Sequence, residues 1–156
     1  MCVRALPQPG ESLAIMKLIM PDLSSVTAPM SEAVTRNIRV EVLSLYSAEN
    51  SRPLQDEWVF QYTVRITNQG TETVQLLSRH WIITDALEHV EEVRGPGVIG
   101  EQPVLAPGES FKYSSWCPLK TPMGMMHGTY RMVRADGGQF EIDIAPFALK
   151  ARYTVN

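Results

Sequence analysis

The stretch WVFQYTVRIT, residues 58–67, alternates between apolar and polar side chains. One face carries Trp58, Phe60, Tyr62, Val64 and Ile66, and the other face carries Gln61, Thr63, Arg65 and Thr67. A period of two is that of a β-strand with one buried face and one face in solvent. This stretch therefore predicts a half-buried strand, and such a strand needs neighbouring strands to pair with.

The segments on both sides follow the same period. Before it, Ile38–Val42 alternates, and a change of phase at Leu43 and Leu45 predicts a bulge. After it, a second bulge is predicted near Leu77–Arg79 within the strand 73–85. Further strands are predicted at 89–94, 111–116, 129–135 and 139–144, the last two joined by the turn Asp136-Gly137-Gly138, and an edge strand at 147–153. Seven or eight short strands without a long amphipathic helix predict an all-β sandwich of two antiparallel sheets.

Length and composition limit the functional classes. The chain has 156 residues, which is typical of one domain, and its net charge of −3 argues against nucleic-acid binding. The two cysteines, Cys2 and Cys117, are too few for a disulfide framework, so we expect a cytoplasmic protein in which Cys117 is a buried thiol.

The N-terminal region differs in composition from the rest. Residues 1–32 contain several prolines and predict a flexible leader ahead of a domain at 33–156, with Met30 as the expected native start. The apolar run Leu13–Met20 is interrupted by Lys17 and is too short for a membrane span, so neither a signal peptide nor a membrane anchor is expected.

A glycine-rich segment offers the most distinctive motif, Gly95-x-Gly97-x-x-Gly100. A dinucleotide fingerprint needs a helix directly after the glycines, but Pro96 interrupts the motif and no helical period follows. The glycines predict a constrained loop between strands. The alternative is an anion nest of main-chain N–H groups that binds phosphate or pyrophosphate. That candidate site consists of Arg94, Gly95, Gly97, Gly100 and Gln102.

Two other groups of polar residues are candidate sites. Arg79 and His80 precede Trp81, but no serine is placed near them by the sequence, so no catalytic triad is predicted. The stretch Asp85–Glu92 collects carboxylates and His89, which could bind a divalent cation or simply lie in solvent. No metal site and no cofactor are assigned, and the protein is predicted not to be an enzyme.

Taken together, several segments resemble the ApaG (CorD) family over about residues 33–155. The segments are Leu77–Asp85 (LSRHWIITD), Val93–Pro103 (VRGPGVIGEQP), Leu105–Ser115 (LAPGESFKYSS) and Thr121–Tyr130 (TPMGMMHGTY), with Phe140–Phe147 beyond them. The sequence departs from the family pattern at Pro96, where many members have an acidic residue, and at Leu87–His89, which replaces a more usual glycine-containing turn.

The resemblance implies a fibronectin type III-like β-sandwich. It also implies an association with cobalt resistance and magnesium efflux, and a protein–protein binding role like that expected of the domain in eukaryotic F-box proteins. The expected partner is a protein of unknown identity or a second copy in a homodimer. The family motif has also been linked to pyrophosphate, and its bacterial genes often neighbour a diadenosine tetraphosphate hydrolase, so a dinucleotide polyphosphate ligand at Gly95–Gly100 is the alternative.

Overall fold

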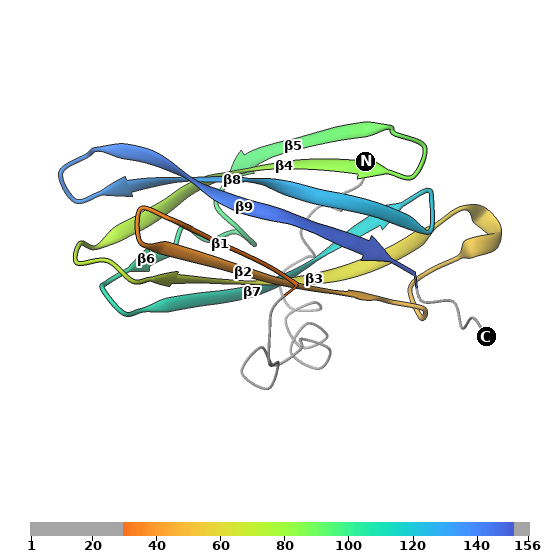
Figure 1. Cartoon of the computed structure of the whole chain (residues 1–156), viewed down its shortest axis with the longest axis horizontal. Coiled ribbons are helices and arrows are strands. Elements are labelled where there is room, and N and C mark those ends of the chain that lie inside the picture. Colours follow the sequence, from red (N-terminus) through yellow and green to blue (C-terminus); the bar gives the residue numbers. More distant parts are fainter. Residues whose placement is uncertain (1–29, 152–156) are drawn as a thin grey trace.

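A computed structural model describes residues 30–151, which fold almost entirely into β-strands (Figure 1). The strands are β1 (Ser31–Thr35), β2 (Ile38–Tyr46), β3 (Trp58–Asn68), β4 (Val74–Asp85), β5 (Val90–Pro96), β6 (Val104–Leu105), β7 (Ser110–Leu119), β8 (Met123–Arg134) and β9 (Gln139–Lys150). A single 3-10 turn, η2 (Pro53–Gln55), interrupts the connection from β2 to β3 within this range.

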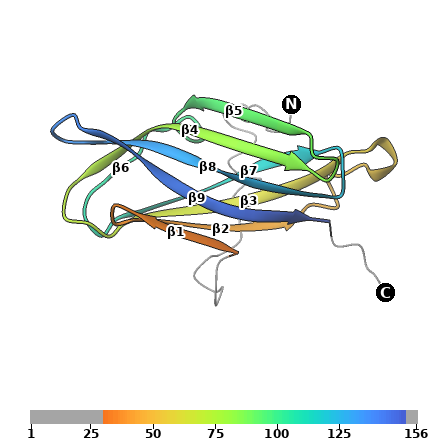
Figure 2. The same cartoon turned by 45° about the horizontal axis from the view of Figure 1, so that its top comes forward.

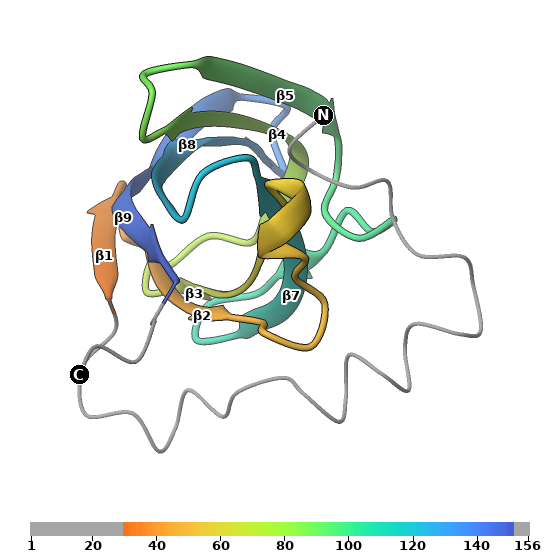
Figure 3. The ribbon, with the colours of Figure 1, turned by 90° about the vertical axis from the view of Figure 1, so that its right-hand side faces the viewer.

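These strands form two antiparallel sheets that face each other (Figures 2 and 3). One has the order β1-β2-β3-β7, and the other has the order β5-β4-β8-β9, with β6 pairing to the start of β4. The predicted sandwich of two antiparallel sheets is confirmed. The predicted count of seven or eight strands is too low, because the five-residue β1 and the two-residue β6 are too short to show an alternating pattern.

The two flanks of the sandwich differ. On one flank β1 and β9 lie side by side, and the Asp143 N–H donates to Thr35 Oγ1 across the two sheets at 3.1 Å (Figure 3). On the other flank the chain crosses from β5 to β7 through residues 97–109. The edges of β5 and β7 on that flank have no strand paired to them among residues 30–151.

The inner faces bury the residues that the alternation selected. Phe60, Val64 and Ile66 of β3 have no exposed surface, and neither has Trp81 of β4. The ring of Trp81 lies at the centre of an aromatic cluster with Tyr62, Tyr130 and Phe147. Cys117 is a buried thiol, as predicted.

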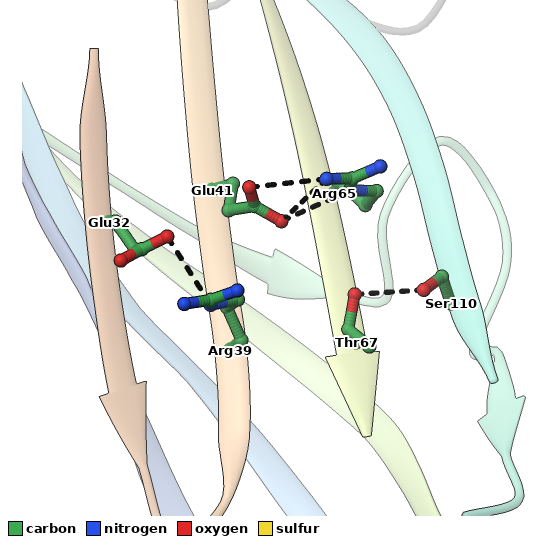
Figure 4. Close-up of polar contacts among 6 residues, drawn as sticks. All are labelled: Glu32, Arg39, Glu41, Arg65, Thr67 and Ser110. Atoms are coloured by element: carbon green, nitrogen blue, oxygen red, sulfur yellow. Dashed lines mark hydrogen bonds and ion pairs between the residues drawn. The ribbon is translucent and has the colours of Figure 1, made fainter. Parts of the chain in front are cut away.

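The outer face of the β1-β2-β3-β7 sheet carries polar cross-strand pairs (Figure 4). Arg65 donates from Nε and Nη2 to the two carboxylate oxygens of Glu41 at 3.0 and 3.2 Å. Arg39 pairs with Glu32 at 3.3 Å, and Thr67 hydrogen-bonds Ser110 at 2.8 Å. Such pairs stabilise a sheet on the face where no core is available.

The pairing register of the strands shows that two predictions about the strands are wrong and that one is confirmed. The bulge expected at Leu43 is absent, because β2 pairs with β3 without interruption and Leu43 and Leu45 simply lie on the outer face. The bulge expected at Leu77–Arg79 is present, since the register of β4 shifts between Leu76 and Ser78. The strands predicted at 139–144 and 147–153 are one strand, β9, with an irregularity opposite Met126–Gly128 that accommodates Pro146.

The predicted leader falls almost wholly outside the described residues. Only its last positions are described, and there Ser31 and Glu32 already belong to β1. The predicted start at Met30 stays a prediction. Within residues 30–151, no helix is long and apolar enough to cross a membrane.

Candidate functional site

The glycine loop, residues 95–102, leads from the end of β5 towards β6. Gly95 is still part of β5 and pairs with Arg79 of β4. The lack of a side chain at Gly95 leaves room for the Arg79 guanidinium, which would lie only 3.1 Å from a Cβ at that position. Arg79 Nη1 donates to the carbonyl oxygens of Pro96 and Gly97 at 2.9 and 2.8 Å. The loop is therefore held down by a charged side chain of the neighbouring strand.

The bulge in β4 supplies the second anchor of the loop. At the bulge, the Leu77 carbonyl accepts hydrogen bonds from the Gly97 N–H at 2.8 Å and from Gln102 Nε2 at 2.9 Å. Gln75 Nε2 in turn donates to the Gln102 carbonyl at 3.0 Å. The bulge and the glycine loop thus form one structural unit, and the Gln102 side chain serves to fix the loop.

The tip of the loop is a tight two-residue turn. Val98 and Glu101 exchange two main-chain hydrogen bonds, of 2.8 and 2.9 Å, around Ile99 and Gly100. Both turn residues have positive φ angles, 42° for Ile99 and 78° for Gly100. A positive φ is unusual for a β-branched residue and costs free energy, so the surroundings must enforce it. The Val98 side chain, which has no exposed surface, does so by anchoring the turn in the core.

Gly97 is the position at which the loop least tolerates a side chain. Its φ is +59°, and a Cβ there would lie 2.2 Å from the Glu101 carbonyl oxygen. Gly100 also has a positive φ, but a Cβ there would meet no atom within 4 Å. A side chain at either position would force a non-glycine residue into a left-handed backbone conformation. Only a side chain at position 97 would also overlap with the Glu101 carbonyl oxygen.

We expect Gly97→Ala to lower the free energy of unfolding by at least about 3 kcal/mol, against about 1 kcal/mol for Gly100→Ala. The difference arises because the Cβ at 97 would break the Val98–Glu101 turn. Urea denaturation followed by circular dichroism measures both values. Equal losses in the two variants would contradict the packing described for this loop.

Of the predicted ligand residues, Arg94 takes no part in the Arg79 and Gln102 hydrogen bonds that anchor the loop. Its side chain is 73% exposed and contacts Glu92 at 3.7 Å. Glu92 also accepts from His80 at 2.7 Å, and this hydrogen bond is the main cause that lowers the pKa of Glu92. Arg94, Glu92 and His80 thus form a surface group on neighbouring strands, whereas Arg79 is the arginine that reaches the loop. Sequence reasoning missed that role of Arg79, because it depends on the register between β4 and β5.

The acidic stretch Asp85–Glu92 is divided by the structure. Asp85 Oδ1 accepts the N–H groups of Leu87 and His89 and so closes the turn before β5. Desolvation raises the pKa of Asp85, but these two hydrogen bonds and the nearby His89 outweigh it, and the pKa is lowered. No group of three or more histidine, cysteine or acidic side chains within the described range could hold a metal ion. Cation binding at this stretch stays an untested alternative, to which the sequence assigned no metal site.

Fold and loop together define a class of protein. Two facing antiparallel sheets, with a glycine loop pinned across one flank, make this a β-sandwich domain of the fibronectin type III or immunoglobulin-like kind. Comparison with known proteins then gives the family, because the ApaG domain model matches residues 48–134. The chain belongs to the ApaG family.

Similar proteins agree in sequence and in fold. Protein ApaG of Rhodospirillum centenum is 56% identical over 120 residues, which cover 77% of this chain and 92% of that protein. Protein ApaG of Brucella anthropi is 52% identical over 130 residues, which cover 81% of this chain and all of that protein. A crystal structure of a Bordetella pertussis protein named ApaA is 51% identical, with a TM-score of 0.72 over 81% of this chain and 98% of that one. These names state no reaction.

Proposed function

We propose that this domain is a non-enzymatic protein-binding module that acts in the cytoplasm in divalent-cation homeostasis. The observation that carries the proposal is the edge of β5, which pairs with no further strand among residues 30–151 and lies beside the glycine loop. A free strand edge can accept an added strand from a partner, because its main-chain N–H and C=O groups have no other strand to pair with. The cellular setting comes from the family resemblance, with its association with cobalt resistance and magnesium efflux.

Exposed apolar side chains along this edge support the proposal. Leu87, before β5, is 68% exposed, Val90 in β5 is 62% exposed, and Val104 in β6 is 57% exposed. On the opposite flank of the described structure the edges of β1 and β9 lie against each other, which leaves them less open to an added strand than the edge of β5. The glycine loop adds a surface of fixed shape, so a partner that binds there does not have to order it.

A photo-crosslinking amino acid placed at Val90 or at Glu101 is expected to form adducts in host cells. The control is the same amino acid placed at Glu141, which is exposed on β9, the strand that lies beside β1 on the opposite flank. It is expected to form several-fold less adduct. The mass of the adduct separates a second copy of this chain from another protein. Adducts of equal yield at all three positions, or none at Val90 and Glu101, would overturn the proposal.

A matched pair of surface variants sharpens this test. We expect Val90→Asp to reduce the adduct formed from position 101, because it places a charge on the proposed binding edge. Val34→Asp makes the same change at a valine that is 52% exposed on β1, on the opposite flank, and should leave the yield unchanged. Equal effects of the two substitutions would place the interaction elsewhere.

Phosphate or pyrophosphate binding at the glycine loop is the second candidate, for a pyrophosphate or dinucleotide polyphosphate ligand. The observation in its favour is that the N–H groups of Ile99 and Gly100 have no hydrogen-bond partner among residues 30–151. The N–H groups of Gly97, Val98 and Glu101 are already used within the fold, which leaves two donors at the tip. Arg94 is the nearest arginine along the chain, so loss of phosphate affinity in Arg94→Ala would support this site.

A further inference from the structure

A partly polar cavity lies at the end of the sandwich where three turns meet. It has a volume of about 340 Å³ and is bordered by the β1–β2 turn, the β3–β4 connection and the start of the β8–β9 turn. The residues that matter for its chemistry are Arg36, Asn37, Thr71, Glu72, Arg134 and Phe140. None of them belongs to the glycine loop or to the proposed binding edge.

Two arginine side chains share one aromatic ring in this cavity. The Cζ atom of Arg134 lies 4.5 Å from the centre of the Phe140 ring, and that of Arg36 lies 5.8 Å from it. An arginine over an aromatic face is held by cation–π attraction. Phe140 itself is 7% exposed and fixed in the core, so it positions both guanidinium groups at the cavity.

The positive charge of this pair is only partly balanced. Arg134 Nε lies 3.4 Å from the Glu72 carboxylate, whereas Arg36 has no ion pair among the described residues. The Glu72 side chain is 67% exposed, and exposed ion pairs contribute little to stability, so an incoming anion can displace it. Asp136, the carboxylate of the adjacent turn, accepts the Gly138 N–H and closes that turn.

Neutral donors complete the cavity. The Asn68 side chain is fully occupied, because it donates to the carbonyls of Glu72 and Leu105 and accepts the Gly70 N–H. It thereby fixes the wall formed by the β3–β4 connection. The Asn37 amide and the Thr71 hydroxyl also border the cavity, and neither has a hydrogen-bond partner within residues 30–151. They are available to a ligand.

The backbone at Arg36 gives independent support. Arg36 and Asn37 form the two-residue turn between β1 and β2, with φ angles of 49° and 66°. Turns of this type favour asparagine, aspartate or glycine, and an arginine in a left-handed conformation costs stability. A residue kept in an unfavourable conformation at a cavity points to a function for its side chain.

We propose that this cavity, the Arg36–Arg134 pocket, binds a phosphoryl dianion. Two guanidinium groups match the charge of a phosphate, and each can donate two hydrogen bonds to its oxygens. The Asn37 amide and the Thr71 hydroxyl supply further donors. The ligand is either free inorganic phosphate or the phosphate end group of a larger molecule, which the same chemistry would recognise.

The test is a calorimetric titration of the full chain with inorganic phosphate, pyrophosphate and methyl phosphate at constant ionic strength. We expect Arg36→Asn to weaken binding about ten-fold or more, because a charge-assisted contact is lost. Asparagine suits this turn better than arginine, so the variant should fold at least as well as the parent. Loss of binding is then separated from loss of fold.

Two further variants should differ in their effect on phosphate affinity. Glu72→Gln should tighten binding, because it removes the carboxylate that competes for Arg134. Arg94→Ala should leave the affinity unchanged, because Arg94 lies on β5 outside this pocket. Loss of binding in Arg94→Ala with none in Arg36→Asn would overturn the pocket and favour the glycine loop.

The choice of ligands separates the two sources of phosphate. Methyl phosphate binding at least as tightly as inorganic phosphate supports an end group of a larger molecule, and tighter binding of inorganic phosphate supports the free anion. No heat at millimolar concentrations of any of the three would overturn the proposal. The crosslinking result at β5 is unaffected by any of these outcomes, because none of the pocket residues lies on that edge.

Discussion

Replacement of Trp81 by alanine should lower the free energy of unfolding by about 3–5 kcal/mol, the range for deletion of a large buried aromatic side chain. The side chain has no exposed surface. Its ring lies 5.2 Å from that of Tyr62, 6.0 Å from that of Phe147 and 6.3 Å from that of Tyr130, measured between centroids. These rings come from β3, β8 and β9, so Trp81 of β4 joins both sheets. Urea denaturation followed by circular dichroism measures the loss.

Two tryptophan variants serve as controls. Trp81→Phe keeps an aromatic ring and removes the indole Nε1, which is buried without a hydrogen-bond partner in the described structure, so it should cost far less than Trp81→Ala. Trp116→Ala removes a partly exposed side chain of β7 and should cost about 1 kcal/mol. If Trp116→Ala cost as much as Trp81→Ala, Trp81 would not be the centre of the core.

The part of the fold that could be predicted from the sequence is the part in which apolar and polar residues alternate. Residues 58–67 identified correctly the face that packs in the core, because a strand in the middle of a sheet has one face in the core along its whole length. The expectation that the opposite face lies in solvent is wrong at Gln61 and Thr63, which are buried, and the Thr63 hydroxyl shares a hydrogen bond with Ser114. The same reasoning failed at Leu43 and Leu45. It treats every apolar residue as buried, but β2 carries both of these leucines on its outer face. Short strands such as β6 depend on tertiary pairing and leave no pattern of their own.

The candidate sites were less predictable than the fold, because they depend on register. The sequence indicated a constrained glycine loop, and the structure explains the constraint through Arg79 and the Leu77 carbonyl. Neither contact can be derived without knowing that Arg79 pairs with Gly95. The Arg36–Arg134 pocket joins residues almost a hundred positions apart. Only its turn, Arg36-Asn37, has a local signal, because an arginine seldom occupies a two-residue hairpin turn of this type.

We expect the domain to lose folding stability steeply at alkaline pH, because three of its tyrosines are buried. Burial raises the pKa values of Tyr62, Tyr113 and Tyr130 above the ordinary value of about 10, and the paired hydroxyls of Tyr113 and Tyr130 share one buried hydrogen bond. The unfolded chain ionises these tyrosines above about pH 10, whereas the folded chain keeps their protons. Since the folded-state pKa is raised, the stabilisation is fully present below pH 10 and is lost as the pH rises.

The expected loss is about 1.4 kcal/mol per pH unit for each tyrosine, and so about 4 kcal/mol per pH unit for the three together. A domain of ordinary stability would then unfold between about pH 11 and 13. Ultraviolet absorbance of tyrosinate and circular dichroism, followed in one titration, should change together, because the buried hydroxyls ionise only on unfolding. Tyr62→Phe should reduce the slope by about one third. Tyrosinate absorbance from all three residues while the sheets remain folded would show that water reaches these hydroxyls, and would contradict the closed aromatic core around Trp81.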